Sequence, residues 1–131
     1  MKVLALDYGA ARTGVAVSDA TGTLARPLEV VRRAATDTGL ARIAALAAEH
    51  EVERIVVGLP LTLRGERGEQ VRETERFVAA LSAVVSVPVE TYDERFTTAL
   101  ASQSGSSNAP EDARAAAFLL ASYLERAGTT G

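Results

Sequence analysis

The stretch KVLALDYGAARTGVAVSD, residues 2–19, decides the fold. Its first part, Lys2–Asp7, is a run of branched and long apolar residues that ends in an acid, a pattern typical of a strand. A short turn rich in glycine and alanine follows, and Gly14–Asp19 predicts a second strand. Two strands joined by so short a turn form an antiparallel hairpin. We expect a third strand over Leu24–Val31, in which Pro27 is tolerated near an edge of the sheet.

Beyond this meander, helices alternate with strands. We expect helices over 36–49, 69–85, 97–103 and 110–126, and strands over 54–58 and 87–92. Strand–helix–strand connections are right-handed crossovers that place the strands in parallel. The expected fold class is therefore α/β, with a mixed five-stranded sheet that carries helices on both faces. We expect a single domain over 1–126 and a flexible tail over 127–131.

The composition is that of a globular protein with one modest core, since 47% of the 131 residues are apolar. No apolar run approaches the roughly 20 residues of a membrane helix, and the N-terminus lacks the long apolar region of a signal peptide. The absence of cysteine excludes disulfides and thiolate chemistry. These features predict a cytoplasmic protein with no membrane association. The net charge of −3 argues mildly against a nucleic-acid binder, although binding depends on how the charge is distributed.

Acidic residues stand in three places where a solvated charge is not expected. Asp7 ends an apolar strand at its carboxyl end, where open α/β sheets bind ligands, although an Asp there can also cap the next turn. Asp112 belongs to a helical stripe that is otherwise apolar or aromatic, so it is expected to point inward, unless it only complements the helix dipole. Asp93 and Glu94 leave a strand end together and point to opposite faces, so only one of them is expected at a shared site.

Convergence of these acids would create a site for a divalent cation. Mutual repulsion would raise at least one pKa strongly, and a cation relieves that repulsion. A ligand set made only of oxygen suits Mg²⁺ or Mn²⁺. Zn²⁺ is disfavoured because His50, the one histidine, lies at a helix end among acids and is best explained as a surface residue. Two such ions are the standard arrangement for in-line phosphodiester cleavage.

Five segments carry a family resemblance, in order along nearly the whole chain. They are LDYGAARTGVAVSD (6–19), ARPL (25–28), IVVGLPL (55–61), DERFTT (93–98) and DARAAAFLLASYL (112–124). The sequence resembles the YqgF family, also called RuvX-type, which is described both as Holliday junction resolvases and as pre-16S ribosomal RNA nucleases. The resemblance implies an RNase H-like fold with carboxylate-bound Mg²⁺ or Mn²⁺. The family's first-strand Asp corresponds to Asp7, the acid of its Asp-Glu-Arg motif to Glu94 and its last-helix Asp to Asp112, with Asp93 in reserve for the motif position.

The resemblance further implies a metal-dependent nuclease whose partner is nucleic acid, either RNA or structured DNA. Arg12 and Arg95 lie inside the family motifs and are expected to bind substrate phosphates. Arg64 and Arg67 are expected to be ordinary surface charges. Family members usually carry a longer, basic segment before the last helix, where this chain has the short, uncharged stretch 103–110. Nucleic-acid contacts are therefore expected to be fewer.

The function expected from these features is 5′-end maturation of pre-16S ribosomal RNA, with pre-ribosomal RNA or the ribosome as partner. One alternative is resolution of Holliday junctions, which needs a symmetric pair of subunits. Another is a non-catalytic ribosome-assembly or nucleic-acid-binding factor, against which the three acids argue. Asp7-Tyr8-Gly9 also fits the phosphate-binding turn of actin-like and sugar-kinase ATPases, but those proteins need two such domains and this chain has one. The sequence is compatible with a monomer or a homodimer.

Overall fold

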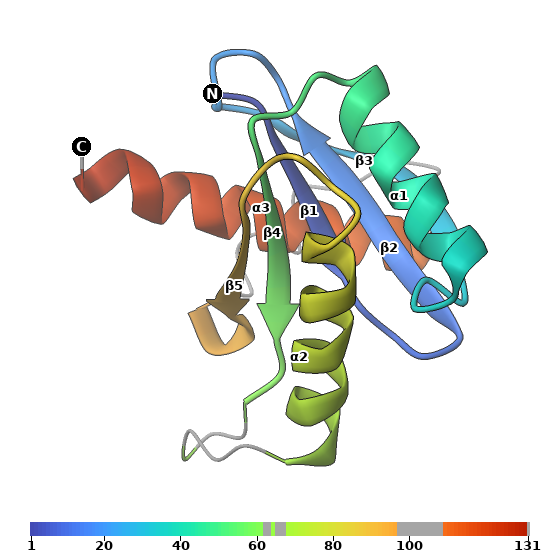
Figure 1. Ribbon diagram of the computed structural model, residues 1–131. Coiled ribbons are helices and arrows are strands. Elements are labelled where there is room, and N and C mark those ends of the chain that lie inside the picture. Colours follow the sequence, from blue (N-terminus) through green and yellow to red (C-terminus); the bar gives the residue numbers. More distant parts are fainter. Residues whose placement is uncertain (62–63, 65–67, 97–108, 131) are drawn as a thin grey trace.

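The computed structural model describes residues 1–61, 64, 68–96 and 109–130. Its helices and strands follow one another as predicted for these ranges, and Figure 1 shows their arrangement. In chain order they are β1 Val3–Asp7, β2 Arg12–Ser18, β3 Ala25–Arg32, α1 Asp37–Glu49, β4 Arg54–Leu59, α2 Glu69–Ser82, β5 Val89–Asp93, the 3₁₀ turn η1 Glu94–Phe96 and α3 Glu111–Thr130.

The strands form one mixed sheet in the order β3-β2-β1-β4-β5. The pairs β1–β2 and β2–β3 are antiparallel, whereas β1–β4 and β4–β5 are parallel. This arrangement confirms the predicted meander followed by parallel strands. The carboxyl ends of β1, β4 and β5 therefore meet at one end of the sheet, which is also where β2 begins and β3 ends.

Helices cover both faces of the sheet, as predicted: α1 and α2 lie on one face and α3 crosses the other (Figure 1). The alternation of side chains along β1 divides its residues between two cores. Leu4 and Leu6 are fully buried on the face of α1 and α2, and Val3 and Ala5 are fully buried on the face of α3. By the same alternation Asp7 belongs to the face that α3 covers.

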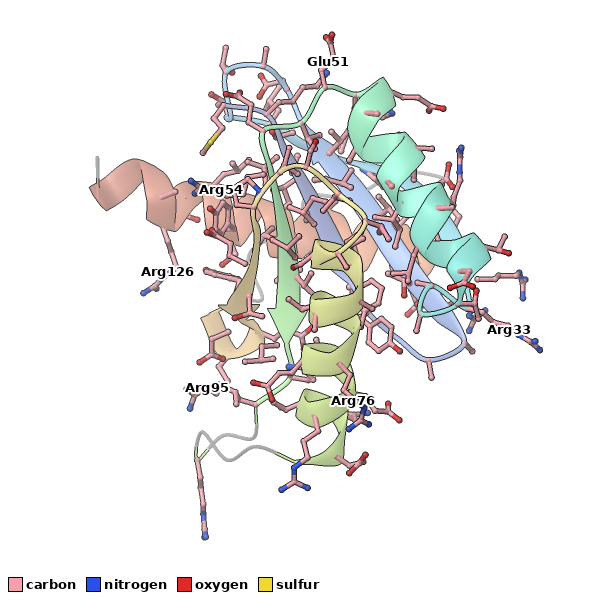
Figure 2. All side chains as sticks on the ribbon, viewed as in Figure 1. Arg33, Glu51, Arg54, Arg76, Arg95 and Arg126 are labelled. Carbon is pink, nitrogen blue, oxygen red and sulfur yellow. The ribbon has the colours of Figure 1, made fainter. Side chains whose placement is uncertain are left out.

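A polar cluster fixes α3 against β4 and β5 near the amino end of β4, beside the Arg54 labelled in Figure 2. The Tyr123 hydroxyl donates to Glu90 and accepts a hydrogen bond of 2.8 Å from Arg54 Nη1. The Tyr92 hydroxyl lies 2.8 Å from Ser122 Oγ, and both side chains are buried. These contacts fix the middle of α3 on the sheet. Because the helix is rigid, they also help to fix where its first turn lies.

Most boundaries differ from the sequence predictions by a residue or two, and β2 begins at Arg12 rather than at the expected Gly14. Three further differences lie in β5, α2 and α3. Strand β5 begins at Val89 rather than at 87, because Pro88 has no N–H to donate to the ladder and pairs only through its carbonyl, which accepts from Ile55. Helix α2 ends at Ser82, before the expected 85. Helix α3 continues past the expected end at 126 to Thr130, since a glycine such as Gly128 costs a helix only about 1 kcal/mol.

Other predictions fall on parts of the chain that are not described. The expected short helix over 97–103, most of the stretch 103–110 and Arg67 lie outside the described residues. Flexibility of the tail 127–131 stays a prediction. In the part of the chain that the structure describes, no helix has both the length and the apolar character that a membrane span requires.

Candidate active site

Asp7 and Glu94 meet at the carboxyl end of the parallel strands. Asp7 ends β1 and Glu94 follows β5, so the whole width of β4 separates their backbones. Gly58 of β4 makes the meeting possible, because a Cβ at that position would lie 2.6 Å from Glu94 Oε1 and 3.0 Å from its Cγ. The Glu94 side chain therefore lies over a strand that has no side chain of its own there. Its carboxyl group reaches hydrogen-bonding distance of Asp7.

Burial, together with a neighbouring negative charge, raises the pKa of both carboxyl groups. Burial, the charge of Asp7 and the hydrogen bond with Asp7 together raise the pKa of Glu94 to about 7. Burial also raises the pKa of Asp7, the hydrogen bond from Glu94 opposes this, and the charge of Asp112 adds to the increase. Near neutral pH the pair therefore retains a proton, with Glu94 as the donor and Asp7 as the acceptor. A divalent cation would take the place of that proton.

The first turn of α3 brings Asp112 beside Asp7. Gly14 of β2 lies directly opposite Asp7 in the antiparallel register. A Cβ at Gly14 would lie 1.8 Å from the backbone carbonyl oxygen of Asp112 and 3.0 Å from the nitrogen of Ala113. The glycine thus lets the helix backbone touch the strand, and no larger residue fits without a shift of α3. Three elements thereby bring Asp7, Glu94 and Asp112 to one end of the sheet.

Asp112 is less buried than its helical stripe predicted. Its side chain is 38% exposed, and its Oδ2 lies 3.3 Å from Nε of Arg12. The reason is that Ala113, Ala116 and Leu120 are the residues that face the core, which turns Asp112 to the edge of the apolar face. Among the described residues no three acidic or histidine side chains already form a metal cage. Asp7 and Glu94 already lie together, whereas Asp112 is paired with Arg12.

Asp93, the reserve candidate, is engaged elsewhere. Its carboxylate accepts hydrogen bonds from Nη2 of Arg95 at 2.6 Å and from the Arg95 backbone N–H at 2.9 Å. The hydrogen bond from the Arg95 side chain lowers the pKa of Asp93. Figure 2 shows Arg95 at the end of β5 and η1, directed away from the sheet. The geometry therefore favours Glu94 over Asp93 as the ligand, and it leaves the guanidinium of Arg95 committed to its own neighbour.

Two hollows flank the Asp7–Glu94 pair. One, of about 250 Å³, is lined by the pair and by residues of α3, among them Phe118 and Leu119. The other, of about 290 Å³, lies between the β1–β2 turn and the start of α2 and is lined in part by Tyr8. The Tyr8 ring stacks on Phe77 with centroids 4.4 Å apart. The pair is therefore reached from both sides.

Sequence reasoning missed Gly14, Gly58 and Tyr8. A glycine inside an apolar strand is a signal of close backbone approach, and both glycines carried that signal. Of the arginines, Arg12 lies at the site through its contact with Asp112, and Arg64 is exposed as expected.

The sequence pattern of the RuvX family, described as Holliday junction resolvase, matches residues 1–126. The chain belongs to the RuvX family. Two relatives of this RuvX-family chain carry the name "Putative pre-16S rRNA nuclease". The relative from Chloroflexus aggregans is 48% identical over 101 residues, which cover 77% of this chain and 71% of that protein. The relative from Sulfurihydrogenibium sp. is 41% identical over 133 residues, which cover 95% and 90%.

Solved structures confirm the fold of this RuvX-family chain. RuvC of T. thermophilus, solved in complex with a Holliday junction substrate, superposes with a TM-score of 0.63 at 22% identity and covers 98% of this chain and 97% of that chain. The Fowlpox virus resolvase, in complex with Holliday junction DNA, superposes with a TM-score of 0.55 at 12% identity and covers 97% and 99%. The RNase H-like α/β fold expected from the sequence is therefore confirmed.

Proposed function

We propose that this chain is a nuclease that hydrolyses phosphodiester bonds with Mg²⁺ or Mn²⁺ held by Asp7, Glu94 and Asp112. The observation that carries the proposal is the carboxyl pair Asp7–Glu94, which meets over Gly58 at the carboxyl end of the parallel strands. Membership of the RuvX family supports the phosphodiester substrate. The names of the relatives support pre-16S ribosomal RNA as the substrate. Within the proposal, the reaction is maturation of the 5′ end of that RNA in the cytoplasm.

The acids fit a hard divalent cation. Bound there, Mg²⁺ or Mn²⁺ would supply an activated water and neutralise charge on the leaving oxygen. Asp7 and Glu94 offer carboxylate oxygens from two strand ends, and the pair gives up its proton in exchange. Asp112 would complete the ligand set if it left Arg12. That exchange frees the guanidinium of Arg12 to bind a phosphate of the substrate strand, so ligand assembly and substrate binding depend on the same ion pair.

Holliday junction resolution is the second candidate, because the family description names it. A resolvase cleaves two symmetry-related strands, so it needs a homodimer with two sites, whereas maturation of a ribosomal RNA end can be carried out by a monomer. The oligomeric state in solution therefore separates the two candidates, and analytical ultracentrifugation with and without junction DNA measures it.

A cleavage assay tests the function directly. Single-stranded RNA, pre-16S ribosomal RNA and four-way junction DNA would each be incubated with the protein and Mn²⁺, with Asp7→Asn as the matched variant. We expect cleavage of the ribosomal precursor by the wild-type protein, and none after the substitution or in excess chelator. Cleavage that survives Asp7→Asn would refute the assignment of the site, and cleavage of junction DNA alone would transfer the function to resolution.

A further inference from the structure

Two arginines face each other across the strands next to the acids. Arg12 begins β2 and Arg32 ends β3, and the two are direct partners in the antiparallel register. Residues that are directly opposite point to the same face of a sheet, with Cβ atoms about 5 Å apart. Like charges in that position destabilise a sheet. The pairing of Arg12 with Arg32 is therefore unfavourable, and an anion bound between the two guanidinium groups would relieve it.

The protein itself compensates only one of the two. Arg12 contacts Asp112 through Nε at 3.3 Å, and 60% of its side chain remains exposed. Arg32 is also exposed, and among the described residues no carboxylate is paired with it. The one acid of β3, Glu29, accepts a bidentate hydrogen bond from Arg42 of α1. Arg32 is thus left with no counter-charge on the face that carries the site.

The two arginines lie on the same face of the sheet as the acids. Gly14 is opposite Asp7, and its close approach to Asp112 marks that face of β2 as the one under α3. Arg12 is two residues before Gly14, so it points to the same face, about 7 Å along the strand. Arg32 is one strand further from Asp7. The order across this end of the sheet is therefore Glu94, Asp7, Arg12 and Arg32, from carboxylates to guanidinium groups.

We propose that Arg32, together with Arg12, binds a backbone phosphate of the substrate strand next to the phosphate that is cleaved. The proposal rests on the nuclease function proposed above and extends it to a residue outside the family motifs. The proposal also defines the path of the substrate strand, which runs from the acid pair across the start of β2 to the end of β3. A phosphodiester anion between the two guanidinium groups removes their repulsion, and Arg offers paired donors for its oxygens.

Arg26 offers a matched control. It lies in the same strand, is exposed, and pairs in register with Val17 at the far end of β3, about 20 Å from Arg32. Replacing either arginine by glutamine changes the net charge of the protein equally. Any difference between the two variants therefore reports position and not total charge.

Binding is measured by fluorescence anisotropy in the Asp7→Asn background, so that no cleavage occurs. The probes are a fluorescein-labelled oligouridylate and the matching oligothymidylate. We expect Arg32→Gln to weaken binding of both about tenfold at low salt and to reduce the slope of log K against log salt by about 0.7, the value for one phosphate contact to a single strand. Arg26→Gln is expected to leave the slope unchanged. Arg32→Lys is expected to keep the slope, because the charge is retained.

Thermal unfolding separates a lost contact from a damaged fold. Because Arg32→Gln removes a repulsion, its melting temperature without nucleic acid is expected to equal or exceed that of the parent protein. The proposal is overturned if Arg32→Gln and Arg26→Gln behave alike, if only the RNA probe is affected, or if the Asp7→Asn protein binds neither probe. Failure of the nuclease function is distinguishable, because a protein that binds through Arg32 but never cleaves with Mn²⁺ refutes the function alone.

Discussion

Replacing Glu94 by glutamine would remove one charge from the carboxyl pair while keeping a side chain of the same shape. The amide N–H of glutamine can still donate to Asp7. In the wild-type protein burial, followed by the charge of Asp7, raises the pKa of Glu94 from an ordinary 4.5 to about 7. The native state therefore binds this proton more tightly than the unfolded chain does. Glu94 contributes stability below about pH 4.5, and this contribution is lost as the pH rises through about 7.

The size of the effect follows from the two pKa values. Their difference corresponds to about 3 kcal/mol, and because the Glu94 side chain is partly exposed, solvent screening reduces this to about 1–2 kcal/mol. For a domain of this size that free energy is worth about 3–8 °C in melting temperature. We expect Glu94→Gln to melt higher than the wild-type protein by that amount at pH 8 in chelator, and at the same temperature at pH 4.5.

The assay is thermal unfolding across pH 4.5–8.5, first in chelator and then with Mn²⁺. A cation that binds only the native state stabilises it by mass action, so Mn²⁺ is expected to raise the melting temperature of the wild-type protein more than that of Glu94→Gln. Parallel curves of melting temperature against pH for the two proteins would refute the reasoning. So would a variant that is less stable than the wild type at pH 8.

Three further substitutions test the geometry of the site. Gly58→Ala would place a methyl carbon 2.6 Å from Glu94 Oε1 and displace that carboxyl group. We expect the cleavage rate to fall at least about tenfold with little change in melting temperature. Full activity would contradict this. Gly14→Ala would place a methyl carbon 1.8 Å from the backbone oxygen of Asp112, so the whole of α3 would have to move. We expect the free energy of unfolding, measured with urea, to fall by about 3 kcal/mol. An unchanged urea midpoint would disprove this. Asp93→Asn is expected to preserve stabilisation by Mn²⁺, and its loss would make Asp93 the ligand in place of Glu94.

The strands of the site could be predicted because their signals are local. The alternation of Val3, Leu4, Ala5 and Leu6 reflects burial on both faces, and Asp7 interrupts it where the chain turns. The crossover rule then places the later strands in parallel, which brings Glu94 to the same end of the sheet. Those steps need only the sequence and general rules of chain topology.

The contacts between elements could not be predicted in the same way. The helical stripe predicts an inward Asp112, but the angle at which α3 meets the sheet decides which residues of that stripe are covered. That angle depends on Gly14 at one end of the contact and on the Tyr123 cluster at the other. The partnership of Asp112 with Arg12 likewise joins residues far apart in the chain. Sequence periodicity carries no information on either.

Strand β3 is an outer strand of the sheet, and its shape limits how the protein can associate. The register with β2 shifts between Val15 and Ala16, where Leu28 is an extra residue, and Pro27 has no N–H to offer a neighbour. A bulged strand with a proline is a poor template for another strand. The bulge and the proline therefore disfavour joining the sheets of two copies through β3 into one continuous sheet, and they protect this edge against strand-by-strand aggregation.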